Sequence, residues 1–204
     1  MKKYFLNFLI ILFISANAVY SQQKIKDFYL SNYKEDGSRD WEITGKEAKV
    51  GEKYVDIDNM NATYYSADKV IIIKSDKATI DKESMNATLK DNIEAKIPTK
   101  DATDYTTITC DGPLEMEYEN GKAVFYNNVV VENRQGKLFC DKATVFFDKD
   151  EKKIIKIIAE GNVKIIQEQN VTVAQKATYL VEQKLLIFEG RPNVIYFPKE
   201  KPNQ

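Results

Sequence analysis

The sequence predicts an all-β protein, an elongated and twisted β-jelly roll of repeated antiparallel strands that follows an N-terminal signal segment. A four-residue element recurs at intervals of 30 to 35 residues, which is typical of stacked or quasi-repetitive folds. Between its copies, apolar and polar residues alternate as they do in half-buried strands. Asn-Gly and Asp-Gly pairs separate these runs and indicate hairpin turns. No segment after Ser21 shows the i, i+3, i+4 apolar pattern of a helix.

The first 21 residues have the layout of a secretory signal peptide. Lys2 and Lys3 precede an apolar stretch from Tyr4 to Ile14, and small residues follow it. That stretch is shorter than the roughly 20 residues that a bilayer span needs. We therefore expect residues 1–21 to be cleaved and the mature protein to lie in the periplasm. The alternative is a retained anchor in the inner membrane that leaves the rest of the chain facing the periplasm.

The strands are placed most readily around the turns. Leu114 to Tyr118 alternates apolar and acidic residues, Asn120-Gly121 supplies a two-residue turn, and Val124 to Val131 runs back. Asp36-Gly37 joins two earlier apolar runs in the same way. Asn-Gly and Asp-Gly favour such turns because both central residues need a positive φ. The mature chain is thus expected to be a row of short antiparallel strands.

The recurring element ends in Lys-Ala-Thr in three of its copies. A small residue at one fixed place in each repeat lets the backbone turn a corner or lets neighbouring sheets approach. The third copy is divergent and is identified mainly by its place in the register. The copies are Lys46-Glu47-Ala48-Lys49, Asp76-Lys77-Ala78-Thr79, Asp111-Gly112-Pro113-Leu114, Asp141-Lys142-Ala143-Thr144 and Gln175-Lys176-Ala177-Thr178.

The composition argues against an enzyme. The chain has no His, so Ser-His-Asp and Cys-His nucleophilic sites and His-containing zinc sites are excluded. It has two Cys, too few for a four-Cys zinc site. Its formal net charge is −1, with 30 basic and 31 acidic residues interleaved, whereas nucleic-acid binders carry a marked basic excess. We expect no catalytic residue, no metal site, no cofactor and no nucleic-acid partner.

Cys110 and Cys140 lie in adjacent repeats at nearly equivalent positions. Stacked repeats tend to bring such side chains together, and a disulfide is feasible in an oxidising compartment. A slip in register would carry the two Cα atoms beyond the ~7 Å limit for a disulfide. The alternative is that both residues are small buried hydrophobes.

Two stretches resemble a known family. Ile25 to Ala48, with its apolar strand, Asp36-Gly37 turn and Trp41-Glu42-Ile43-Thr44-Gly45-Lys46-Glu47-Ala48, is similar to the opening of LptC-type proteins. Leu138 to Ile165, which leads through Ala143 into Gly161-Asn162-Val163, resembles the OstA/LptA repeat. The resemblance covers the chain from Ile25 to Phe197 and implies division into an LptC-like part (24–100), an OstA/LptA-like part (101–198) of the same jelly roll, and a tail (199–204).

This resemblance implies a periplasmic lipopolysaccharide-binding and transfer protein, part of outer-membrane assembly. It would belong to the export bridge between the inner and outer membranes. Its expected partners are the lipid A acyl chains of lipopolysaccharide, an inner-membrane ABC transporter complex, and like jelly-roll domains. The domains would pair through exposed edge strands, here expected at Lys26 to Tyr33 and Asn193 to Phe197. Whether the chain fills the LptC or the LptA role stays open at this point.

Strand alternation gives each repeat one apolar face, and strands that close around it enclose an apolar interior. Such an interior could hold acyl chains if side chains do not fill it. As single residues, its members are first of all expected to form core. The predicted interior residues are Ile43, Ile57, Ile71, Ile73, Ile80, Met116, Tyr118, Val124, Tyr126, Val145, Phe147, Ile155, Ile157, Val163, Ile165, Val173, Tyr179, Leu186 and Phe188.

Two other functions are compatible with the sequence. The chain could be a structural or adhesive β-repeat protein of the cell envelope, although inward Tyr and Phe favour a roomier core than adhesins have. A His-free glycosidase with two carboxylates is the third reading. Its carboxylates would be unique to one repeat, whereas the acidic positions here recur.

Overall fold

The protein is all-β, as the sequence predicted. A computed structural model describes residues 23–65, 70–98, 104–148 and 153–195, so the predicted signal peptide and tail lie outside the described residues. Among the described residues, no helix is long and apolar enough to cross a bilayer. The strands are β1 (Gln23–Tyr33), β2 (Arg39–Val50), β3 (Tyr54–Tyr65), β4 (Val70–Asp81), β5 (Ala87–Lys90), β6 (Ile93–Pro98), β7 (Tyr105–Cys110), β8 (Leu114–Glu117), β9 (Lys122–Asn133), β10 (Gly136–Asp148), β11 (Lys153–Gln167), β12 (Asn170–Leu180), β13 (Leu185–Glu189) and β14 (Asn193–Ile195).

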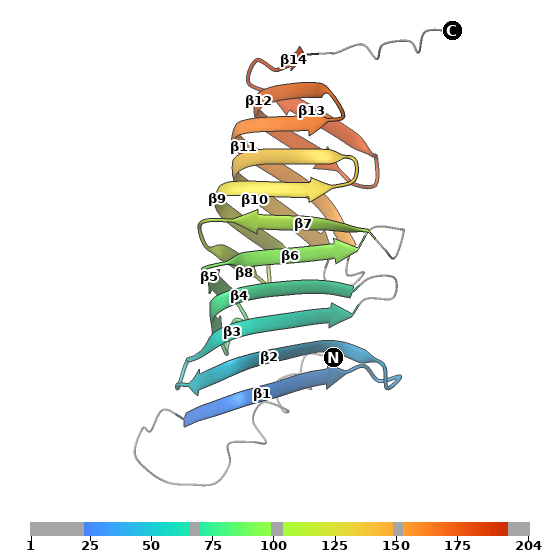
Figure 1. Ribbon diagram of the computed structural model, residues 1–204. Helices are drawn as coiled ribbons and strands as arrows, with labels where there is room; N and C mark the ends of the chain where they lie inside the picture. Colours follow the sequence, from blue (N-terminus) through green and yellow to red (C-terminus); the bar gives the residue numbers. More distant parts are fainter. Residues whose placement is uncertain (1–22, 66–69, 99–103, 149–152, 196–204) are drawn as a thin grey trace, which may run out of the picture.

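The strands form one sheet in which the described pairings are antiparallel. Figure 1 shows them stacked side by side, from β1 at one end to β12, β13 and β14 at the other. Hairpins connect most neighbours, and the Asp36-Gly37 turn between β1 and β2 is closed by Asp36, which accepts hydrogen bonds from the Ser38 backbone at 2.9 Å and the Ser38 hydroxyl at 2.6 Å. The stack is the elongated jelly roll that the sequence predicted.

Each long strand bends in the middle, so the sheet has two walls. One half of β4 pairs with β5 and the other half with β6. The strand β9 divides in the same way between β8 and β7, and β12 between β13 and β14. We call the wall with β5, β8 and β13 the first wall, and the wall with β6, β7 and β14 the second wall. The interior lies between them.

The bend has the same backbone chemistry in every second strand. At the bend, the backbone enters the left-handed region at Asp27 in β1, at Asn59 in β3, and at the pairs Asp91-Asn92, Asn127-Asn128, Gly161-Asn162 and Gly190-Arg191 farther along the chain. Asn, Asp and Gly tolerate a positive φ better than other residues do. We call these positions the corner of each strand. Five Asn residues, Asn59, Asn92, Asn127, Asn128 and Asn162, are therefore placed where the walls meet.

The recurring element lies next to this corner. Asp76 and Asp141 face corner residues of the following strand and accept hydrogen bonds from Asn92 and Asn162, at 2.7 and 2.9 Å. In the divergent copy, Asp111 accepts one from Asn128 at 2.8 Å. The Asp of the repeat is thus a corner acceptor, which stabilises each bend with a charge-assisted hydrogen bond.

The Ala of the recurring element lines the interior of the first wall. Strand pairing places Ala48, Ile57, Ala78, Leu89, Leu114, Phe125, Ala143, Ala159, Ala177 and Phe188 in one row across the sheet. The four Ala of the repeat are 2 to 4% exposed. In the divergent copy the row residue is Leu114 and not Pro113, because Gly112 adds one residue to that corner. The Ala residues of the repeat are thus buried core residues of the first wall.

Candidate functional site

The interior between the two walls is one apolar cluster that runs along the whole stack. Its buried members extend from Phe28 on β1 through Leu89, Leu114 and Val129 to Ala177 on β12. Leu114 and Val129 are 0% exposed, and burial of such a side chain stabilises the fold by roughly 1.5–3 kcal/mol. No break divides the cluster, so the stack is a single hydrophobic unit.

The structure places most of the predicted interior residues in this cluster. Ile57, Val145 and Val163 are buried in it, and the remaining ones are partly buried and packed against it. The partly buried ones are Ile43, Ile73, Ile80, Met116, Phe147, Ile157, Ile165 and Phe188.

Three predicted residues lie on the inward face but at the borders of the cluster. Ile71 is two residues from Ile73 on β4 and pairs with Tyr64. Tyr179 and Leu186 pair with one another near the end of the stack, in the row that also contains Val145 and Ile157. Leu186 is 39% exposed because few strands lie beyond it.

Five predicted interior residues are wrong. On β9, Ala123 and Phe125 face the interior, so Val124 and Tyr126 face outward. Tyr126 donates a hydrogen bond from its hydroxyl to Glu115 at 3.0 Å. Partial burial and this hydrogen bond raise the pKa of Tyr126. Val124 is buried on the outer face, where it pairs with Thr144.

The other three errors have local causes. Val173 pairs with Lys164 on the outer face, because the bend of β12 shifts the alternation: Ala174 and Ala177 both face the interior although they are three residues apart. Ile155 lies at a bulge of β11, where the register shifts between Phe146 and Phe147, and it is 43% exposed. Tyr118 follows the end of β8 in a turn and is 53% exposed.

The sequence analysis missed the residues at the corners. Phe28 is 8% exposed and packs over Gly45, where a Cβ atom would lie 2.7 Å from the Phe28 ring. Met60 and Ile93 follow left-handed residues and turn into the interior of the second wall. The signal that could have found them is the Asn or Asp before each, because it marks the point where the alternation restarts.

Cys110 and Cys140 belong to the interior and are both free. Cys140 pairs with Val129 on β9, and β7 lies on the other side of β9. One strand therefore separates the two Cys, and two strand spacings of about 4.8 Å exceed the limit for a disulfide. The disulfide reading is thus wrong, and the alternative of two small buried hydrophobes holds. Burial raises the pKa of the Cys140 thiol to about 11.

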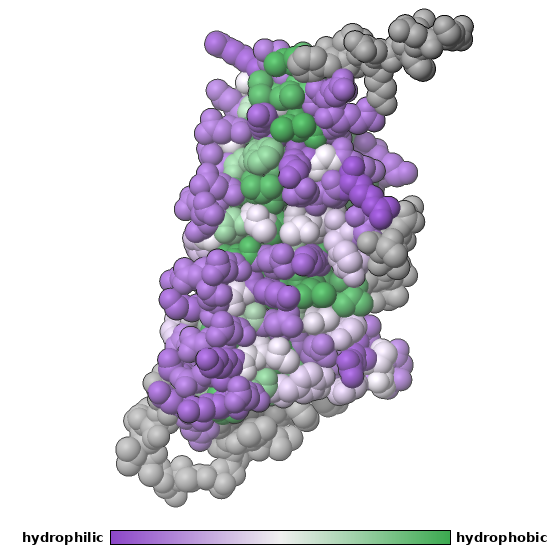
Figure 2. Space-filling model, in the orientation of Figure 1, coloured by the Kyte–Doolittle hydropathy of each residue, from purple (hydrophilic) through white to green (hydrophobic). Residues whose placement is uncertain are grey.

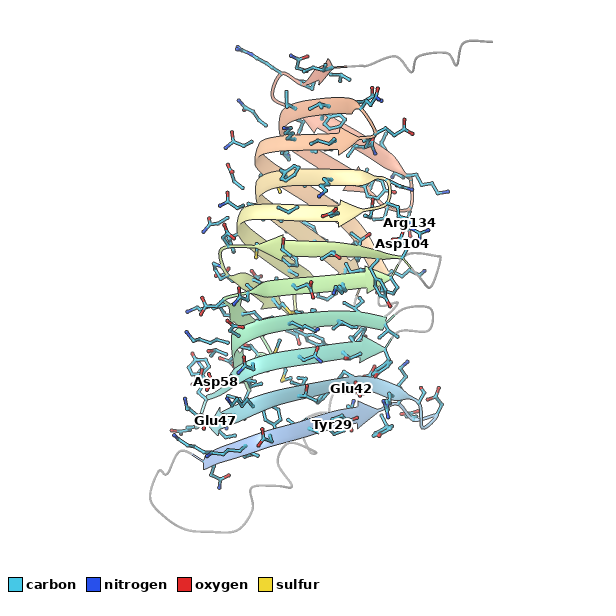
Figure 3. The ribbon with its side chains drawn as sticks, viewed as in Figure 1. Tyr29, Glu42, Glu47, Asp58, Asp104 and Arg134 are labelled. Atoms are coloured by element: carbon cyan, nitrogen blue, oxygen red, sulfur yellow. The ribbon has the colours of Figure 1, made fainter. Side chains whose placement is uncertain are left out.

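The outer surface is charged, in contrast to the interior. Lys142 pairs with Glu160 at 3.4 Å, and Lys176 with Glu189 at 2.7 Å. Near the other end, Lys49 lies 3.5 Å from Glu47 and 3.7 Å from Asp58 (Figure 3). Exposed pairs of this kind stabilise a fold by about 0.2–1 kcal/mol each. Among the described residues, no cluster of three or more His, Cys, Asp or Glu side chains could hold a metal ion.

In the part of the chain that the structure describes, the inward rows end in exposed apolar side chains at both ends of the stack. Ile25 and Leu30 continue two inward rows onto β1 and are 39% and 43% exposed. At the other end, Leu186 and Val194 continue inward rows onto β13 and β14 and are 39% and 61% exposed. Figure 2 shows green apolar side chains gathered toward this second end. The arrangement can therefore receive an apolar chain or a further apolar unit at either end.

Comparisons with known proteins agree with this geometry. The family model described as lipopolysaccharide-assembly, LptC-related, matches residues 15–138. The model described as LptA/(LptD N-terminal domain) LPS transport protein matches residues 107–200, so the two overlap over 107–138. The comparison with curated proteins gave no match.

The fold also matches a solved structure. The crystal structure of LptH from Pseudomonas aeruginosa, described as the LptA-homologous periplasmic component of the lipopolysaccharide transport device, superposes with a TM-score of 0.50. The two sequences are 14% identical, and the match covers 63% of this chain and 95% of that one. At this identity the likeness shows the fold alone.

Proposed function

Because this chain belongs to the LptC-related family of lipopolysaccharide-assembly proteins, we propose that it carries lipopolysaccharide by holding the lipid A acyl chains in its apolar interior. The family consists of transport proteins that are not enzymes. The observation that carries the proposal is the inward apolar cluster, which runs unbroken from β1 to β13 and is exposed at both ends. Acyl chains are apolar and would exchange water for this surface at roughly 25 cal/mol per Å².

The same geometry supports a proposal for the place of the chain in transport. An interior that is open at both ends can receive a lipid at one end and pass it on at the other. The exposed edges of β1 and of β13–β14 can extend the sheet of a like jelly-roll domain by main-chain hydrogen bonds. We propose that such contacts link this chain to other components of the bridge, including the inner-membrane ABC transporter complex. The periplasm is the proposed location of the mature chain.

Two of the expectations from the sequence remain proposals. The leader at residues 1–21 is proposed to be cleaved, and N-terminal sequencing of the exported protein would show Met1 if it were retained as an anchor. The division of the jelly roll near residue 100 into an LptC-like and an OstA/LptA-like part is proposed as well.

Adjacent Phe residues on β10 provide a matched test of lipid binding. Phe147 packs against the interior cluster, whereas Phe146 faces outward beneath Lys156, whose Nζ lies 4.2 Å from the centre of its ring. A photo-reactive amino acid at Phe147 should capture lipopolysaccharide in living cells. The same probe at Phe146 should not. Equal capture at the two positions, or capture at neither in folded and exported protein, would refute binding in the interior and favour a structural role in the envelope.

A further inference from the structure

The free edge of β1 can extend both the sheet and the interior. Within the described residues, β1 pairs with β2 only, so the backbone groups of its other edge face no strand. The edge is 11 residues long, which is long enough to hold a partner strand. Its inward Ile25 and Leu30 would be covered by the next strand of an extended stack.

The direction of β1 determines the direction of a strand that continues the stack. Successive rungs are antiparallel, so β1 runs in the same direction as β3, β9, β11 and β13. A second copy stacked head to tail would therefore bring its β13–β14 beside β1 as a parallel strand. Every described pairing in this sheet is antiparallel, and parallel pairing is slightly less stable per residue. The natural continuation is a strand of opposite direction.

The corner of β1 carries the opposite hydrogen-bonding chemistry to the later corners. At those corners, Asn92, Asn128 and Asn162 donate to a carboxylate on the preceding strand. A strand that docks on β1 would occupy the place of its preceding strand. The left-handed residue of β1 is the exposed Asp27, with φ 47°. It offers a carboxylate acceptor where these three corners offer an amide donor.

A donor already faces Asp27 on the side of β1 that is paired. The register puts Lys26 opposite Glu47 and Phe28 opposite Gly45, so Asp27 lies opposite Lys46 of β2. The recurring element of β2 thus has Lys at the place where β4 and β10 have Asp76 and Asp141. Compared with the later corners, β2 has Lys46 in place of the Asp of the repeat, and β1 has Asp27 in place of the corner Asn.

We infer that the free edge of β1 accepts an antiparallel strand of a different protein, and that this strand carries a Lys, Arg or Asn side chain at its bend beside Asp27. The inference deepens the edge pairing proposed above and rests on it. A second copy of this chain does not supply such a strand. Paired through β1 alone, two copies would set two Asp27 carboxylates side by side, and like charges directly opposite one another destabilise a sheet.

Peptides copied from this chain test the charge rule without lipid. The probe is a fluorescent peptide with the sequence of β2, Arg39–Val50, whose bend residue is Lys46; its control has Lys46→Glu. The mature protein should bind the β2 peptide about fivefold more tightly than the control, which is the range for an exposed ion pair. The Asp27→Lys variant should reverse this preference. Equal binding of both peptides by both proteins, or binding of neither, would overturn the inference.

Two further measurements test the direction of the bound strand and the identity of the partner. Spin labels at introduced Cys residues report distances, since the native Cys110 and Cys140 are buried. A label on the peptide N-terminus should lie close to Tyr33→Cys and far from Lys24→Cys, and the reverse would show a parallel strand. Sedimentation should show no head-to-tail association of the protein; assembly abolished by excess β2 peptide would identify a second copy as the occupant and overturn the inference. Lipid capture at Phe147 is measured separately, so either proposal can fail alone.

Discussion

The corners of the first strands differ from the corners of the later ones. In β1 and β3 a single left-handed residue, Asp27 or Asn59, faces one residue of the neighbouring strand. In β9, both Asn127 and Asn128 lie opposite the single Asp141 of β10. The later corners are thus bulges, with one extra residue that bends the strand more sharply.

This difference explains why the repeat is uneven in the sequence. The Asp of the repeat is present at positions 76, 111 and 141, where the second residue of a bulged corner donates a hydrogen bond to it. The first copy begins with Lys46 and faces the unbulged corners of β1 and β3. In these four copies, corner geometry and the first residue of the repeat therefore change together. The fifth copy begins with Gln175, which packs against Gly190 of a bulged corner.

The largest expected effect comes from crowding a bulged corner. In Gly161→Ala the new Cβ would clash with Oδ2 of Asp141, at a φ of +76°. We expect a loss of about 3 kcal/mol in the free energy of unfolding, from the left-handed backbone and the contact together. Gly37→Ala is the matched control, because its φ is +80° and nothing lies within 4 Å; it should lose about 1 kcal/mol. Urea unfolding measures both, and equal losses would contradict the crowding.

Truncation of the first side chain of the repeat should have different effects at the two kinds of corner. Asp141→Ala deletes the acceptor of the Asn162 hydrogen bond and should lower the free energy of unfolding by about 1 kcal/mol. Lys46→Ala, at the equivalent place beside an unbulged corner, should change it by less than about 0.5 kcal/mol. A larger loss for Lys46→Ala would show that the first corners depend on their own polar pair.

A double-mutant cycle measures the contact itself. Asn162→Gly keeps the left-handed backbone and removes the donor. Combined with Asp141→Ala it should show a coupling energy of about 0.5–1 kcal/mol. The pair Asn59→Gly and Lys46→Ala should show a coupling close to zero. Similar couplings in the two cycles would remove the distinction between the corners.

The last expected effect depends on pH and concerns the residue that precedes the recurring element, which is small in its first four copies: Gly45, Ser75, Cys110 and Cys140. Burial raises the pKa of Cys140 from 9.0 to about 11. The folded protein therefore keeps this proton at a pH where the unfolded chain has lost it. The contribution to stability is complete below pH 9 and is lost between pH 9 and about pH 11. Cys140→Ser should make the decline of stability over this range shallower, and an unchanged decline would refute the assignment.

Much of the fold could be predicted from the sequence because its signals are local. Alternation, Asn-Gly turns and the recurring Ala each depend on a few neighbouring residues. The interior assignment failed at the bend of β12, because Ala174 and Ala177 both face the interior although they are three residues apart, and Val173 was therefore placed on the wrong face. Val124 and Tyr126 were misplaced for another reason: Ala123 to Tyr126 is apolar on both faces, so the pattern does not say which face is buried.

The disulfide reading failed for a similar reason. Cys110 and Cys140 occupy the same row of the interior, as their spacing suggested, but spacing along the chain does not give the number of strands between two positions. The strand β9 returns between them. The order in which strands pair depends on the whole sheet, so it cannot be read from a short stretch of the sequence.

The single Trp of the chain gives the most direct test of the central claim, that acyl chains occupy the interior. Trp41 lies two residues before the inward Ile43 on β2 and pairs with Tyr64, which puts it on the inward face. Lipid A with bromine atoms on its acyl chains should quench the fluorescence of Trp41, because bromine quenches only at close range, and unbrominated lipid A should not. Binding of the brominated lipid without any quenching of Trp41 would show that the acyl chains lie elsewhere and would contradict the account.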